Sequence, residues 1–495
     1  MIFRRSILMA MTIFTGASAG ATTPRDLRST AIEVYSETQN LTAANCTAKL
    51  SALSSKVNSY RSWELMRSVV KRDSKTIIEN LWRSRLNIRE KMQEFADNGA
   101  LSPQCVSSIR NAFRSFRFME EYVAVHTLPV GAWVEAKATR VYSGGFPWLV
   151  EGPQKLEVKD GDVLVSYGMA YGSAAIAHVG EDSGTFSHMA IVHEDASGKL
   201  VTIEAHPEFG VKVAPLEKYL TDGKGRSAVF RHRDTVLATR AAKRIYDIAA
   251  KADFSGHPIP YDFTMNLSEP SRLFCAEVVK YAFDLAASDL KKKNVMPPFP
   301  TKIAMKNPYI LNAFGIESRV TFAPSDIEVD SQFNLIAEWR DIARVRMMHH
   351  QQAALQMQFR WLDTLSYQYR SDLRTIIDSR ALFLARRLPL FQGFVDDLVP
   401  PDLSERTLEA VVQVYLVSED IHEALVLKDE EREATLGVLL TSAEILTAAE
   451  KNRQEDLEGY LAYQRWIQFD RISGSPAPSS QQWHWLLRSD AEFVD

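Results

Sequence analysis

The chain has 495 residues, of which 46% are hydrophobic and 24% charged, and its formal net charge is −4. This length predicts roughly two to four domains, and the composition is ordinary for a globular protein with sizeable cores. The slightly acidic balance gives no reason to expect a nucleic-acid partner.

The first residues carry the parts of a secretory signal in the required order. Arg4 and Arg5 precede an apolar run over residues 7–14, and Ala17-Ser18-Ala19 offers the small-x-small pattern of a cleavage site. We therefore interpret residues 1–19 as a signal peptide, with a buried N-terminal helix as the alternative. No later window approaches the roughly 18 apolar residues of a membrane span. The mature chain is expected to be exported, periplasmic or secreted, and to have no transmembrane segment.

Residues 22–126 are expected to form a helical N-terminal region. Apolar residues recur there at three- and four-residue spacing, over residues 29–59, 62–97 and 103–124.

Two of the three cysteines could form a disulfide, and the third would then be unpaired. Cys46 and Cys105 lie in the N-terminal region, where intervening helices let the chain return, so in an oxidising compartment a disulfide is favoured over two buried thiols. Cys275 is then unpaired, and a lone thiol in an exported protein is a candidate nucleophile.

Residues 127–335 have a different sequence pattern. Glycines and prolines interrupt any helix there, and short β-rich runs follow. Strands are expected over residues 162–165, 188–193, 200–205, 211–214 and 228–231, and helices over about 239–252 and 274–287. Residues 336–495 return to a helical pattern from about Glu338. The sequence thus predicts an α/β-type middle domain between N- and C-terminal all-α regions.

Residues 188–206 predict a β-hairpin with a glycine-containing turn. In the register that pairs Ala190 with Glu204, His188 opposes His206 on the same face. His188 and Glu204 are then diagonal neighbours, roughly 7–8 Å apart at Cβ, which long side chains can close. A slip of one residue would separate them, and the turn does not fix the register.

Cys275 falls in the first turn of a predicted helix whose apolar stripe includes Phe274 and Val278. Exposed N–H groups and the helix dipole favour a thiolate there, and the Cys275 N–H could stabilise an oxyanion. His188 could take the thiol proton, and Glu204 could fix the imidazole tautomer. We expect the acidic limb of activity to report a Cys275–His188 ion pair.

Each of these residues also has a structural interpretation. Cys275 could be a small buried apolar residue, which is a common fate of a free cysteine. His188 could be a satisfied strand histidine, and His206 or a backbone carbonyl could orient it instead of Glu204.

Five segments resemble, in order, the permuted branch of the NlpC/P60 papain-like superfamily, the YiiX/YaeF-like cysteine hydrolases. The segments are Gly161-Asp162-Val163-Leu164, residues 187–192, Ile203-Glu204-Ala205, Pro260-Tyr261-Asp262-Phe263 and residues 273–279. The resemblance covers roughly residues 155 to 335. It implies an α+β, circularly permuted papain-like domain in which His188, Glu204 and Cys275 are catalytic. Ala276 departs from the pattern, where serine often follows the nucleophile, and Tyr261 is expected to line the cleft or to lie in the core.

We therefore expect an exported cysteine hydrolase, an amidase or peptidase that acts through a thioester, with a cell-envelope peptide as a natural substrate. A lipid acyl hydrolase or acyltransferase using the same site, and an inert envelope interaction protein, are the alternatives. No cofactor or metal is expected. The sequence has no zinc or phosphate-loop motif, and His349 and His350 diverge by about 100° on a helix.

Overall fold

A computed structural model describes most of the chain. The described residues are 26–127 without 66, 158–370 without 170, 183, 222–223 and 294–295, then 404–471, 476–478 and 483–489. The predicted signal at residues 1–19 lies outside them, as does the start of the predicted middle domain. Among the described helices, none combines the length and the apolar character that a membrane crossing requires.

The N-terminal region is helical, as predicted, over its described residues. It comprises α1 (Leu27–Gln39), α2 (Cys46–Asn58), the 3-10 turn η1 (Ser62–Glu64), α3 (Arg67–Asp97) and α4 (Pro103–Thr127). The stretch 29–59 is two helices because the chain turns over residues 40–45. At the start of α1, Asp26 accepts hydrogen bonds from the Arg28 and Ser29 N–H groups and thereby caps the helix.

A disulfide joins Cys46 at the start of α2 to Cys105 in the first turn of α4, which confirms the predicted pairing. Both cysteines are buried in the core that α1–α4 share. Cys275 is the free cysteine, and it is also buried.

We predict that a Cys46→Ser/Cys105→Ser variant is less stable than the wild type by about 4 kcal/mol, because the bridge closes a long loop in the unfolded chain. The sequence separation of the two cysteines is 59 residues. Denaturant unfolding measures the difference, and non-reducing peptide mapping should recover the two cysteines in one linked species. Two free thiols in protein purified without reductant would contradict the pairing.

The middle domain is built on a six-stranded antiparallel sheet in the order β4-β3-β2-β1-β5-β8. Its strands are β1 (Val163–Gly168), β2 (His188–Glu194), β3 (Leu200–His206), β4 (Gly210–Pro215), β5 (Lys224–His232) and β8 (Phe333–Arg340). The first five were predicted. The last was not, and the predicted domain boundary at residue 335 falls inside it.

The end of the edge strand β8 differs from the prediction, which expected a helical pattern from about Glu338. Glu338 and Arg340 are fully buried in it and pair with charged residues of α3 and α4. Two charged residues so close together are typical of an exposed helix. Glu338 and Arg340 can be buried in a strand because charged residues of α3 and α4 pair with them. The helical region therefore begins at α10, after Arg340.

One face of the sheet is covered by α7 (Thr235–Phe254) and α8 (Cys275–Asp289), both close to their predicted ranges. Their apolar stripes share a core with alternate strand residues such as Met189 and Ile191. The small cluster on the other face joins Ala190 and Val192 to α6 (Leu216–Thr221). The shorter elements are α5 (Tyr171–Ile176), β6 (Thr301–Lys302), α9 (Pro308–Phe314), β7 (Val320–Thr321) and η2 (Pro324–Val329).

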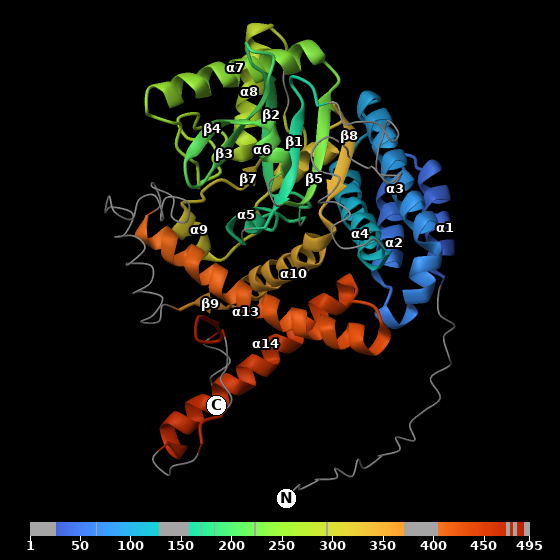
Figure 1. Cartoon of the computed structure of the whole chain (residues 1–495), viewed down its shortest axis with the longest axis vertical. Coiled ribbons are helices and arrows are strands. Elements are labelled where there is room, and N and C mark those ends of the chain that lie inside the picture. Colours follow the sequence, from blue (N-terminus) through green and yellow to red (C-terminus); the bar gives the residue numbers. More distant parts are fainter. Residues whose placement is uncertain are drawn as a thin grey trace, which may run out of the picture.

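The C-terminal region is mainly but not wholly helical, so the expectation of an all-α region needs correction. It contains α10 (Ile342–Thr364), α13 (Glu405–Leu436), α14 (Ser442–Arg465) and the π-helical turn η3 (Trp466–Asp470). The short strands β9 (Gln368–Tyr369) and β10 (Leu487–Arg488) pair with each other. In Figure 1 these helices lie below the sheet, and the N-terminal helices lie beside its β8 edge.

A buried ionic network joins the N-terminal helices to this edge. Arg85 of α3 donates to Glu120 of α4 and to Glu338 of β8 at 2.6–3.0 Å. Arg226 of β5 makes two 2.6 Å bonds to Glu121. Burial alone would raise the pKa of both Glu121 and Glu338, but the arginines hold each pKa well below its usual range. The helices and the sheet therefore share both an apolar core and a paired polar interface.

Candidate active site

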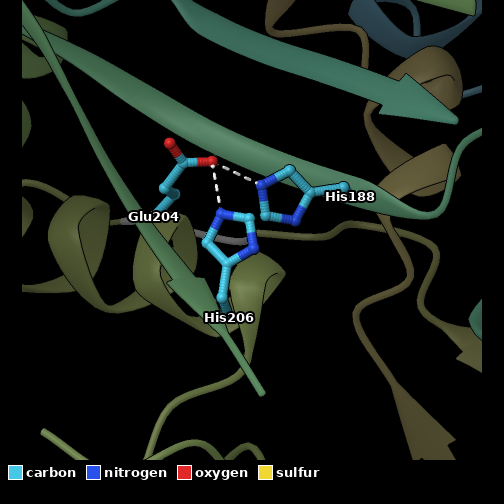
Figure 2. Close-up of side chains that lie close together, drawn as sticks. All are labelled: His188, Glu204 and His206. Atoms are coloured by element: carbon cyan, nitrogen blue, oxygen red, sulfur yellow. Dashed lines mark hydrogen bonds and ion pairs between the residues drawn. The ribbon is translucent and has the colours of Figure 1, made fainter. Parts of the chain in front are cut away.

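The predicted register of the β2–β3 hairpin is confirmed. Ala190 is paired with Glu204, and the ladder continues to Glu194 and Leu200. His188 Nε2 lies 2.6 Å from Glu204 Oε2. Figure 2 shows the rings of His188 and His206 both turned toward this carboxylate.

Glu204 is held by three side chains. Its Oε2 accepts from His188 and, at 3.0 Å, from His206 Nε2, and its Oε1 accepts from the Thr202 hydroxyl at 3.0 Å. Burial by itself would raise the pKa of Glu204, but the hydrogen bonds from the two histidines hold it well below its usual range. An ionised carboxylate only accepts, so both histidines carry a proton on Nε2. Nδ1 of neutral His188 is then the ring nitrogen that can act as a base.

Two of these supporting residues were not assigned a role from the sequence. Thr202 lies two residues before Glu204 on the same strand, and the period of two places both side chains on one face. His206 was expected only to replace Glu204 as the orienting group or His188 as the base. In the structure it contacts Glu204 together with His188, with the two rings 4.7 Å apart.

The thiol of Cys275 lies where β2 and β3 separate. The ladder between the two strands ends at Ala190 and Glu204, although β3 continues to pair with β4 as far as His206. In the fork, Sγ donates to the Ser187 carbonyl oxygen at 3.9 Å and accepts from the Met189 N–H. The sulfur thus contacts the backbone on both sides of His188, and the structure brings the three predicted site residues together.

The start of α8 is fixed by the preceding loop. The Phe274 N–H donates to Glu277 Oε2 at 3.0 Å, and the Leu273 N–H donates to the Pro260 carbonyl at 3.0 Å. Cys275 is the first residue of the helix. Its N–H therefore has no acceptor one turn back within the helix and can face a developing oxyanion.

The Tyr-Asp segment before this helix has a structural role. Tyr261 is buried, with its ring 4.8 Å from that of Phe263, so the core interpretation holds. Asp262 accepts from the Thr264 and Asn266 N–H groups and from the Thr264 hydroxyl, which fixes the turn that leads to α8.

Burial decides the resting charges of the nucleophile and the base. Cys275 is 1% exposed, and burial raises the pKa of its thiol to about 12, although the Met189 and Ala276 N–H groups offset part of the effect. Burial also lowers the pKa of His188, with Glu204 opposing the shift. The thiol and the imidazole are therefore both neutral near pH 7. Burial of both groups therefore opposes the Cys275–His188 ion pair that the helix N-terminus favours, and the pH profile of activity is the test between them.

We predict that the acidic limb of kcat/KM lies below pH 6.5, the ordinary pKa of histidine. His188 must be neutral to accept a proton, and a lowered pKa keeps it neutral at more acidic pH. Glu204 raises the pKa of His188, so Glu204→Gln should move the limb further to acidic pH. Profiles of kcat/KM against pH for both proteins measure this. A limb above pH 6.5, or a shift toward alkaline pH in Glu204→Gln, would contradict it.

Three residues of the site could also hold a metal ion. Within the described residues, one ligand atom each of His188, Glu204 and His206 lies within 4.8 Å of the other two. To bind a metal, both histidines would have to release the Nε2 protons that they donate to Glu204. The hydrogen bonds account for the present arrangement. His349 and His350 bond to different carboxylates, of Glu121 and Asp429, and do not share a site.

A thiol at the first turn of a helix, beside a histidine and an acidic residue on an antiparallel sheet, is the arrangement of papain-like domains. The comparison with family models gives the same class. Residues 157–326 match the family described as permuted papain-like amidase enzyme, YaeF/YiiX, C92 family, which confirms the resemblance seen in the sequence. The match covers about a third of the chain and contains Cys275, His188 and Glu204. No curated protein matches the chain significantly.

Proposed function

We propose that the protein is an exported cysteine amidase or peptidase whose substrates are peptides of the cell envelope. The observation that carries the proposal is the position of the Cys275 thiol in the fork between β2 and β3, next to a histidine that an ionised glutamate orients. The amidase family match supports an amide or peptide bond as the bond that is cleaved.

The reaction proceeds through a thioester. Sγ of Cys275 attacks the substrate carbonyl carbon while its proton passes to Nδ1 of His188. The Cys275 N–H faces the developing oxyanion. The imidazolium then gives its proton to the leaving nitrogen as the C–N bond breaks. Water, deprotonated by His188, finally attacks the thioester and releases the acid and the thiol.

Glu204 acts through His188. It stabilises the imidazolium that forms in the first step and holds the ring in the Nε2–H tautomer. His206 and Thr202 in turn fix the carboxylate, so the base keeps one orientation through both steps.

Two features support export. Residues 1–19 have the charge, apolar run and small residues of a signal peptide. The Cys46–Cys105 disulfide is also suited to an oxidising compartment, where such bridges persist.

A substrate screen tests the proposal. Purified mature protein and the Cys275→Ala variant are incubated with cell-wall peptides and, in parallel, with acyl lipids. We expect release of new amine and carboxyl groups from the peptides by the wild type alone. Thiol-dependent release of fatty acid without peptide cleavage would instead assign the site to lipid acyl groups. Inactivity toward both, with an unreactive Cys275, would favour an envelope interaction protein.

A further inference from the structure

A cavity of about 200 Å³ lies where the three regions of the chain meet. Its walls come from α4, from the segment between β1 and β2, from β5 and from α10, and the start of α14 closes it. The polar residues that matter for its chemistry are Arg114, His178, Arg226, His349, Gln352 and Gln356. This volume is several times the roughly 30 Å³ that one water molecule occupies in the liquid, so a small solute fits.

The described lining contains no carboxylate but does contain two arginines. Arg226 is already neutralised by Glu121. Arg114 bonds to the side-chain amide oxygen of Asn111 at 2.9 Å, and within the described part of the chain it forms no ion pair. Burial lowers the pKa of Arg114, and the nearby charge of Asp182 offsets part of the effect. A partly buried guanidinium that forms no ion pair can accept an anion.

His178 provides an independent observation. It is 8% exposed, and neither ring nitrogen has a hydrogen-bond partner among the described residues. Burial and the nearby charge of Arg114 lower its pKa to about 3. Buried polar side chains are nearly always satisfied, so an imidazole that lines a polar cavity with both nitrogens unused indicates a missing ligand.

We propose that this cavity binds a small oxyanion, a phosphate or carboxylate group held between Arg114 and His178. The guanidinium offers two parallel N–H donors to such a group, and the imidazole offers one. Gln352 and Gln356 add side-chain amides from α10. The site is separate from the Cys275 site and gives the helical regions a function, because α4, α10 and α14 all contribute to its walls.

Calorimetric titration of the mature, disulfide-bonded protein tests the proposal with sodium phosphate and, separately, sodium succinate, against sodium chloride at equal ionic strength. We expect saturable binding of at least one oxyanion at one site per chain. The tighter of the two identifies phosphate or carboxylate as the natural group. Arg114→Gln should weaken binding roughly 10–100-fold, since it removes a charge-assisted bond. Arg83→Gln, which removes one charge from the exposed side of α3, should leave it unchanged.

A second measurement covers the case in which Arg114→Gln does not fold. In the wild type, the ring resonances of His178, assigned with a His178→Gln variant, should shift as oxyanion is added and should saturate with the calorimetric affinity. No saturable binding of either anion beyond chloride, binding that Arg114→Gln leaves intact, or His178 resonances that do not respond would overturn the proposal.

Discussion

Replacing Cys275 by alanine is expected to reduce hydrolysis to the uncatalysed background while the protein stays folded. The sulfur is the atom that forms the thioester, and no other described cysteine is free. Cys275→Ser should also lose nearly all activity, by roughly 10³-fold or more, because a hydroxyl is a far weaker nucleophile than a thiol at this position. Steady-state rates on the substrate found by the screen, with thermal unfolding of each variant, measure both effects.

A matched control separates chemistry from folding. The Cys46→Ser/Cys105→Ser variant leaves Cys275 as the remaining cysteine and should keep its turnover at temperatures where it is folded. Wild-type turnover in either Cys275 variant would show that the thiol is not the nucleophile.

Replacing His188 by alanine is expected to lower kcat/KM by roughly 10⁴-fold, and replacing Glu204 by alanine by about 10–100-fold. His188 receives the proton of a thiol whose pKa is about 12, so without it almost no thiolate forms at neutral pH. Glu204 orients the ring and stabilises the imidazolium, and His206 or water can replace part of this.

Two conservative variants sharpen this comparison. Glu204→Gln keeps an acceptor for His188 but loses the charge, and it should fall between the wild type and Glu204→Ala. His206→Ala leaves the bond between His188 and Glu204 in place and should have the smallest effect. If His188→Ala were as active as Glu204→Ala, His188 would not be the base, and His206 on the neighbouring strand would be the candidate.

The hairpin that carries the site could be predicted because its information is local. Alternation of apolar residues predicted β2 and β3, and among the registers that the turn leaves open the structure has the one that pairs Ala190 with Glu204. The helix that begins at Cys275 could likewise be predicted, from its apolar stripe. The disulfide was predicted from the compartment and from the helices between the two cysteines, and these helices do bring the chain back so that Cys46 and Cys105 pair.

Other features depend on contacts that are distant in sequence. The end of strand β8 has a helical sequence pattern. It can be a buried strand because arginines of α3 and α4 neutralise Glu338, and the sequence does not reveal these contacts. The cavity around His178 is formed by segments from all three regions, and no short motif marks it. The resting protonation of Cys275 depends on how completely the fold covers the thiol, whereas its place at a helix start predicted the opposite shift.

Activity-based labelling tests the central claim most directly. The purified protein is treated at neutral pH with a peptide-based electrophile, and the modified residue is identified by peptide mapping. We predict a single adduct on Cys275 in the wild type and a large loss of labelling in His188→Ala, because the buried thiol depends on that base to react. Labelling of Cys275 at an equal rate in His188→Ala, or a Cys275 that reacts only after denaturation, would contradict the account.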